Sequence, residues 1–219
     1  MPKLKAICFD MDGIIVNSEP YHFKSTQLAL KKEGFNYSQE QGKFFVGKTV
    51  KETITTICKK NNIKNIQQIL EDRESLFNEM LQNELQLREG IFNILKIIKS
   101  KNIKAAIVTS GVRSYLEKVV EKFEISEFFE TYITLEDVKN PKPDPSPYLK
   151  AAKALNEPPN LCCAFEDSTI GLESAFQAGM YSIAIPGPET KQDNFYRNSN
   201  GIPPFSPRSV IIFNFTKTQ

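Results

Sequence analysis

Two carboxylates stand two residues apart directly after the first apolar run of the chain. The segment reads Phe9-Asp10-Met11-Asp12-Gly13. A carboxylate can attack phosphorus and form an acyl phosphate, which is then hydrolysed or passed to another acceptor. A second carboxyl group within hydrogen-bond reach can give a proton to the leaving oxygen and take one from the incoming water. The pair predicts phosphoryl transfer with Asp10 as the nucleophile and Asp12 as the acid/base.

A second pair of carboxylates, Glu166 and Asp167, follows another apolar run. Carboxylate oxygens are hard ligands of the kind that Mg²⁺ uses together with phosphate and water, and Glu166-Asp167-Ser168 offers neither His nor Cys. Four carboxylates beside an anionic substrate would also repel it strongly without a cation. The sequence therefore predicts a Mg²⁺ site formed by Asp10, Asp12, Glu166 and Asp167.

One lysine and two hydroxyl residues are the candidate phosphate-binding groups. Lys142 lies in Pro141-Lys142-Pro143, where the prolines stiffen the backbone and could hold its ammonium against a phosphate and the nucleophile. Thr109 and Ser110 follow a third apolar run. Each feature alone is common, since acidic pairs occur in turns and lysines between prolines are often solvated. Only their combination favours a catalytic site over ordinary loop chemistry.

Short apolar runs end where these polar residues begin, and helical patterns separate the runs. This alternation of strand and helix patterns is typical of a parallel sheet. Such a sheet binds its ligand at the carboxyl ends of the strands, near the point where the strand order reverses. We therefore expect an α/β, Rossmann-like core whose strands cover residues 6–9, 105–108, 132–135, 161–165 and 181–185.

The block from 19 to 88 has a different pattern of apolar residues. Pro20 suits a helix start, apolar residues recur at helical spacing, and no strand pattern interrupts the block. At 219 residues the chain has room for one main core and a smaller insertion. We expect a core domain from 1–16 and 90–219, with an all-α domain inserted at 17–89.

Charge and composition limit the partners. The formal net charge is only +2, with 28 basic and 26 acidic residues in mixed order, so no footprint for a nucleic acid or an anionic membrane is visible. Asp10 and Asp12 interrupt the first apolar run, which argues against a signal peptide and predicts a cytoplasmic protein. The four cysteines lack paired metal-ligand spacing and are expected to be reduced and structural. A small molecule is the expected partner, and the protein is expected to be a monomer or a weak dimer.

Four segments in order carry a family resemblance: FDMDGIIVNSEP, VTSG, KPDPSPY and FEDSTIGLESAFQAG. They resemble the four motifs of the haloacid dehalogenase (HAD) superfamily, particularly its phosphatase and β-phosphoglucomutase-like branch with a small helical cap. The resemblance covers about residues 4–186. It implies that Asp10 is the nucleophile, that Asp12 is the acid/base, and that Thr109 and Lys142 bind phosphate.

The same resemblance implies a set of magnesium ligands. Asp167 and Asp10 would bind through their side chains, and the main-chain carbonyl of Asp12 would complete the protein ligands. Glu166 would either touch the metal directly or act through its water shell.

The resemblance also implies that the helical block is a cap that closes over the site and selects the substrate. Its candidate substrate-contacting residues are Glu19, His22, Gly47 and Lys48. His22, the only histidine, lies where mutase-like relatives can approach substrate, and the alternative is a structural role inside the cap. Val50 stands where sugar-phosphate mutases place an arginine for a second phosphate, and valine offers no donor.

These observations favour a Mg²⁺-dependent phosphatase of a small phosphorylated metabolite such as a sugar phosphate. A β-phosphoglucomutase-like phosphomutase is the nearest alternative, and Val50 argues against it. Carbon–halogen hydrolysis needs neither Asp12 nor a metal. A binding or regulatory protein that kept the fold and lost turnover is the alternative from another class, opposed by the intact set of catalytic side chains.

The segment 187–219 departs from the family pattern because it is rich in proline, asparagine and serine. Only 210–215 has a strand-like pattern there. If these residues do not pair with the sheet, they would form an exposed strand suited to aggregation or to a partner.

Overall fold

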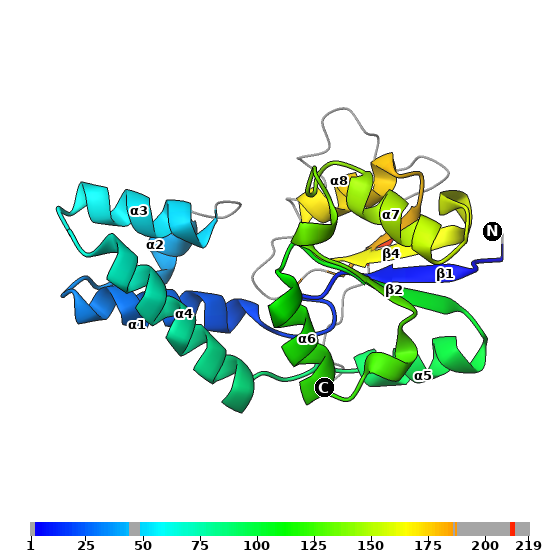
Figure 1. The fold of residues 1–219 in the computed structure, drawn as a ribbon, viewed down its shortest axis with the longest axis horizontal. Coiled ribbons are helices and arrows are strands. Elements are labelled where there is room, and N and C mark those ends of the chain that lie inside the picture. Colours follow the sequence, from blue (N-terminus) through cyan, green and yellow to red (C-terminus); the bar gives the residue numbers. More distant parts are fainter. Residues whose placement is uncertain (1–2, 44–48, 186, 188–210, 213–219) are drawn as a thin grey trace. The chain divides into compact units, whose positions relative to one another are not determined.

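The computed structural model describes residues 3–43, 49–185, 187 and 211–212. The chain divides into two compact units (Figure 1). The core unit consists of Met1–Asn17 and Leu87–Gln219, and the helical unit consists of Ser18–Gln86. None of the described helices is long and apolar enough to cross a membrane.

The core unit is built on a six-stranded sheet in which every neighbouring pair of strands is parallel. Its order is β3-β2-β1-β4-β5-β6, so the chain runs outward from β1 in one direction and then returns to build the other side. The strands are β1 (Ala6–Phe9), β2 (Lys104–Val108), β3 (Thr131–Ile133), β4 (Cys162–Glu166), β5 (Tyr181–Ala184) and β6 (Ile211–Ile212). The predicted parallel α/β sheet is confirmed.

Strand β1 lies at the centre of the sheet and explains why its sequence is continuously apolar. All of its residues are buried, because helices cover both faces of the sheet. Phe9 pairs with Ile107 of β2 and with Phe165 of β4. These three strands therefore end at the same edge, and the strand order reverses beside β1, which is where α/β sheets bind ligands.

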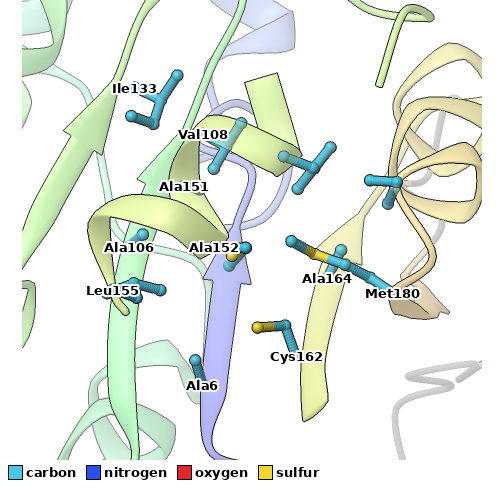
Figure 2. Close-up of a cluster of buried hydrophobic side chains, with 14 residues drawn as sticks. Ala6, Ala106, Val108, Ile133, Ala151, Ala152, Leu155, Cys162, Ala164 and Met180 are labelled. Atoms are coloured by element: carbon cyan, nitrogen blue, oxygen red, sulfur yellow. The ribbon is translucent and has the colours of Figure 1, made fainter. Parts of the chain in front are cut away.

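Four helices flank this sheet. Figure 1 shows α7 and α8 on one side of the strands and α5 and α6 on the other. The side of α7 carries a buried apolar cluster to which the strands contribute small side chains, including Ala6, Ala106 and Ala164 (Figure 2). Small residues there let the helices pack close to the strands. The helices are α5 (Ile91–Ser100), α6 (Arg113–Lys122), α7 (Ser146–Ala154) and α8 (Thr169–Gln177), with 3₁₀ turns at Ser126–Phe128, Leu135–Asp137 and Pro159–Leu161.

The expected strand over 132–135 is partly wrong. The strand ends at Ile133, and Leu135 begins a 3₁₀ turn. The cause is a capping interaction, since one carboxylate oxygen of Asp137 accepts hydrogen bonds from the backbone N and the hydroxyl of Thr134, at 2.9 and 2.8 Å. This cap turns the chain as soon as β3 reaches the functional edge of the sheet.

The strand-like pattern at 210–215 falls mainly outside the described residues. Within the described part, Ile211 and Ile212 pair in parallel with Ile183 and Ala184 of β5. Part of the tail thus extends the sheet beyond β5.

The helical unit contains no strand among its described residues. Its elements are α1 (Glu19–Lys32), α2 (Gln39–Lys43), α3 (Val50–Lys60) and α4 (Ile66–Asn83). Helix α3 begins at a capping box, in which Thr49 and Glu52 bond each other's backbone N–H groups at 2.8 and 3.2 Å. The unit has its own apolar core, formed by Ala29, Leu30, Tyr37, Ile54, Ile57, Cys58 and Ile69.

All four cysteines are buried and have free thiols. Burial raises the pKa of the Cys163 thiol to about 12, and that of Cys162 to about 11. Thiols with raised pKa values are poor nucleophiles, which agrees with the structural role expected from the sequence.

Two fully buried serines of the core unit make a matched test of hydrogen bonding. Ser174 donates its hydroxyl to the main-chain oxygen of Asp144 at 2.6 Å, whereas the Ser182 hydroxyl finds no partner among the described residues. We expect Ser182→Ala to raise the free energy of unfolding by about 1 kcal/mol and Ser174→Ala to lower it by about 1 kcal/mol. Urea unfolding measures both changes, and a loss of stability in Ser182→Ala would show that its hydroxyl is bonded.

Candidate active site

The edge at the carboxyl ends of β1, β2 and β4 gathers the polar residues predicted from the sequence. Asp10, Thr109, Lys142 and Glu166 are all buried there, although such side chains are usually exposed. Buried polar groups need partners, so the contacts among these side chains define what the site can do.

Lys142 joins the ends of three strands. Its ammonium donates to Asp10 Oδ1 at 2.6 Å, to Glu166 Oε1 at 2.7 Å and to the main-chain oxygen of Val108 at 2.8 Å. An ammonium has three hydrogens, so these bonds use its whole donor capacity. The lysine side chain is only 3% exposed, and the proline-framed loop thus holds a buried cation against the candidate nucleophile.

Several hydrogen bonds hold the Glu166 carboxylate at the end of β4. Its Oε1 also accepts from the Tyr148 hydroxyl at 2.5 Å, and its Oε2 accepts from the Ser168 hydroxyl at 3.0 Å. Gly171 in α8 leaves room for this carboxylate, because a Cβ there would lie 2.0 Å from its carboxyl carbon. Ser168 accepts from the Gly171 N–H as the N-cap of α8. The carboxylate is therefore held rigidly beside Lys142.

Burial and neighbouring charges shift the pKa values of Asp10 and Lys142. Burial raises the pKa of Asp10 well above its usual range; Lys142 opposes this rise, and the carboxylates of Glu166, Asp167 and Asp12 add to it. Burial alone would lower the pKa of Lys142, but Asp10 and Glu166 outweigh it and raise that pKa. The lysine stays charged, while the surrounding carboxylates leave an excess of negative charge that a bound cation would relieve.

Three of these carboxylates are close enough to share one metal ion. One oxygen each from Asp10, Glu166 and Asp167 lies within 4.8 Å of the others. Gly13 creates the space for this arrangement, because a Cβ at that position would lie 1.8 Å from Asp167 Oδ2. An all-oxygen, anionic cluster suits a hard divalent cation. The residues present therefore fit the metal that the sequence predicts.

Gly13→Ala tests whether this space matters for metal binding. We expect the variant to bind Mg²⁺ about 10-fold or more weakly in titration calorimetry, because its methyl group displaces Asp167. Gly34→Ala is the matched control, since Gly34 has the same φ of 78° but no atom within 4 Å of the added Cβ. Equal Mg²⁺ affinity in both variants would show that metal binding does not depend on the space that Gly13 leaves for the Asp167 carboxylate.

The remaining predicted residues of the core unit lie around the loop after β2. Thr109 is buried and accepts a hydrogen bond from the Gly111 N–H at 2.9 Å, whereas Ser110 is exposed. Asp12 is half-buried, and its Oδ1 accepts from the Tyr115 hydroxyl at 2.7 Å. Tyr115 is absent from the sequence-based set, as are Tyr148 and Ser168.

The candidate substrate residues of the helical unit divide into two groups. Gly47 and Lys48 lie outside the described residues. Glu19 is exposed in the first turn of α1. His22 is engaged within its own unit, with its Nδ1 2.6 Å from a guanidinium nitrogen of Arg73 and its ring stacked on Phe77 at 4.3 Å.

That contact fixes the tautomer of His22. Arginine can only donate, so Nδ1 must accept the hydrogen bond and the ring proton must reside on Nε2. Arg73 is itself buried and lies over the Phe77 ring at 4.3 Å. Arg73 is the one charged side chain on the buried face of α4 (Ile66–Asn83), and its place among apolar residues at helical spacing was a sequence signal that could have pointed to this cluster.

Comparison with known proteins identifies the class to which this fold and site belong. The model of the haloacid dehalogenase-like hydrolase family matches residues 7–185. The chain belongs to this family and is thus an enzyme of the hydrolase class, as the four motifs predict.

Individual relatives include both phosphatases and a mutase. The chain is 29% identical over 185 residues to the phosphorylated carbohydrates phosphatase of Thermotoga maritima, covering 82% of this chain and 84% of that protein. It is 26% identical over 192 residues to the β-phosphoglucomutase of Bacillus subtilis, covering 83% of each. The crystal structure of a HAD hydrolase from Entamoeba histolytica aligns with a TM-score of 0.80 and 26% identity, covering 96% of this chain and 93% of that one.

Proposed function

We propose that this chain is a Mg²⁺-dependent phosphatase that hydrolyses a small phosphorylated metabolite through an aspartyl-phosphate on Asp10. The observation that carries the proposal is the position of the Asp10 carboxylate, which Lys142 holds at 2.6 Å beside two further carboxylates at the ligand-binding edge of the sheet. Similarity to the phosphorylated carbohydrates phosphatase of T. maritima supports a sugar phosphate as the substrate class.

In the first step, an oxygen of Asp10 attacks the phosphorus of the monoester and the bond from phosphorus to the ester oxygen breaks. The bond from Lys142 to Oδ1 fixes the rotamer of the nucleophile, so less ordering is needed when substrate arrives. Thr109 offers a hydroxyl near the transferred group, and we assign it a hydrogen bond to a phosphoryl oxygen. Ser110 is exposed in the same loop, and we assign it a weaker contact.

Asp12 handles the protons of both steps. Its carboxyl group gives a proton to the leaving ester oxygen, so that an alcohol departs. Its carboxylate then takes a proton from the water that attacks the phosphorus of the aspartyl-phosphate. The bond from phosphorus to the Asp10 oxygen breaks, inorganic phosphate is released and the free carboxylate of Asp10 is regenerated. The protons balance over the two steps, because Asp12 recovers in the second step the proton that it donated in the first.

The side chains of Asp10 and Asp167 and the main-chain carbonyl of Asp12 would hold Mg²⁺. When bound, the ion would neutralise charge on the phosphoryl oxygens and on the surrounding carboxylates. Glu166 is part of the same oxygen cluster, but its two oxygens already accept bonds from Lys142, Tyr148 and Ser168. We therefore assign Glu166 mainly to holding Lys142.

The helical unit is proposed to act as the substrate-selecting cap. Its boundaries in the structure are Ser18–Gln86. Glu19 and His22 are its candidate substrate contacts among the described residues, and Gly47 and Lys48 belong to the same proposal. His22 would present its Nε2 hydrogen as a donor, because Arg73 occupies Nδ1.

Similarity to the B. subtilis β-phosphoglucomutase supports a second candidate, a sugar phosphomutase. A mutase must hold a second phosphate, which calls for charged donors. Val50, at the position where such enzymes place an arginine, packs instead against the apolar core of the helical unit. The phosphatase is therefore the better supported function.

Phosphate release from a panel of sugar and other alkyl phosphates, with Mg²⁺ or with EDTA, tests the proposal. We expect release from at least one sugar phosphate with Mg²⁺ and none with EDTA. Transfer to a second sugar phosphate in place of release would establish the mutase. Absence of both reactions across the panel would reject the proposed function.

A further inference from the structure

Asp12 is bonded to a tyrosine from a distant part of the chain. The hydroxyl of Tyr115 donates to Asp12 Oδ1 at 2.7 Å across a separation of 103 residues. Tyr115 lies in the first turn of α6, which begins just after the loop that carries Thr109. The next residue, Leu116, is fully buried and anchors this end of the helix. The phenol therefore reaches the acid/base candidate from a fixed element.

The tyrosine ring is placed by close packing. An ideal Cβ on Gly111 would lie 3.3 Å from Tyr115 Cδ1, 3.2 Å from Thr109 Oγ1 and 3.6 Å from Met11 Cε. All three side chains therefore lie against Gly111, and the ring of Tyr115 lies beside the loop that carries Thr109. Gly111 is held in turn, because its carbonyl accepts from the Leu135 N–H at 3.1 Å. One edge of the Tyr115 ring therefore packs against a backbone segment that is itself hydrogen-bonded.

We propose that Tyr115 is a positioning residue for proton transfer by Asp12, an inference that rests on the proposed function. A carboxyl group can rotate and present either oxygen, and a fixed donor removes that freedom. Because the phenol donates to Oδ1, the proton that Asp12 carries belongs on Oδ2. That proton passes to the ester oxygen as the phosphorus–oxygen bond breaks, and a proton from the attacking water returns to Oδ2 in the second step.

The test compares two substrates that differ in their need for a proton. An alkyl phosphate releases a poor leaving group that must be protonated, whereas p-nitrophenolate is stable enough to leave without a proton. For Tyr115→Phe, we expect kcat/KM to fall about 10-fold or more with the best alkyl phosphate of the panel. With p-nitrophenyl phosphate, kcat/KM should change by less than about 3-fold, since this constant reports the transfer to Asp10.

A purely structural role would lower kcat/KM equally for both substrates, and that result would overturn the proposal. Tyr115→Phe keeps the ring, so the thermal stability of this variant should match that of Tyr181→Phe. Tyr181 is a suitable control because it begins β5 and so lies at the amino ends of the strands, away from the site. In an Asp12→Asn background, Tyr115→Phe should lower kcat/KM by less than about a further 2-fold, because the carboxyl group through which Tyr115 acts is already replaced.

The inference and the proposed function can fail separately. Native rates in Tyr115→Phe for both substrates would overturn the positioning role and leave the phosphatase assignment standing. The phosphatase assignment depends instead on phosphate release by the native protein and on its loss when Asp10 is replaced.

Discussion

Asp10→Asn is expected to lower phosphate release by at least about 10⁴-fold, because an amide cannot form the acyl phosphate that carries the reaction. The substitution preserves the shape of the side chain, and Oδ1 can still accept from Lys142 at the same place. A loss of this size therefore reports missing nucleophilic chemistry. Steady-state rates with the best substrate of the panel provide the measurement.

Stability measurements separate this chemical effect from misfolding. Because burial raises the pKa of Asp10 in the folded protein, its ionised form disfavours folding at any pH above its usual range. The amide removes that charge, so Asp10→Asn in EDTA at neutral pH should be at least as stable as the native protein. A folded Asp10→Asn variant that still releases phosphate at near-native rates would exclude Asp10 as the nucleophile.

Lys142→Met is expected to lose both stability and activity. The substitution leaves Glu166, which is fully buried, without its cationic partner, and breaking a buried ion pair from one side costs about 3–5 kcal/mol. Loss of the donor to Asp10 should also lower the rate by about 100-fold or more. Urea unfolding in EDTA gives the stability change without any contribution from a bound metal.

Two variants make this result specific to the buried site. Lys150→Met removes an ammonium that is half-exposed and 3.5 Å from Asp137, so it should cost less than about 1 kcal/mol. Adding Glu166→Gln to Lys142→Met removes the uncompensated charge and should recover part of the lost stability without restoring activity. Equal stability losses in Lys142→Met and Lys150→Met would contradict the description of Lys142 as a buried clamp.

The positions of the central residues could be predicted because backbone rules determine them. The apolar run before Asp10 predicts a buried strand, and parallel strands bring their carboxyl ends to one edge, which places Lys142 and Glu166 within reach. The structure confirms this sheet and joins Asp10, Lys142 and Glu166 in direct hydrogen bonds. Strand limits were less predictable, as the cap at Thr134 shows.

The contacts that support these residues could not be predicted. The bonds from Tyr115 to Asp12 and from Tyr148 to Glu166 depend on the rotational phase of α6 and α7 and on the room left by nearby glycines. Periodicity shows which face of a helix is apolar, but it does not reveal which hydroxyl on that face meets a carboxylate. The bond between Arg73 and His22 likewise requires α1 and α4 to be packed first.

Direct detection of the covalent intermediate tests the central claim most directly. In Asp12→Asn, transfer from p-nitrophenyl phosphate needs no acid, whereas hydrolysis still needs the base, so the phosphoenzyme should accumulate. Quenching the reaction into borohydride reduces an acyl phosphate to an alcohol, and peptide mass spectrometry locates the changed residue. We expect reduction at Asp10, only with substrate and Mg²⁺ present. Release of p-nitrophenolate with Asp10 unmodified, or with the phosphoryl group on another residue, would contradict it.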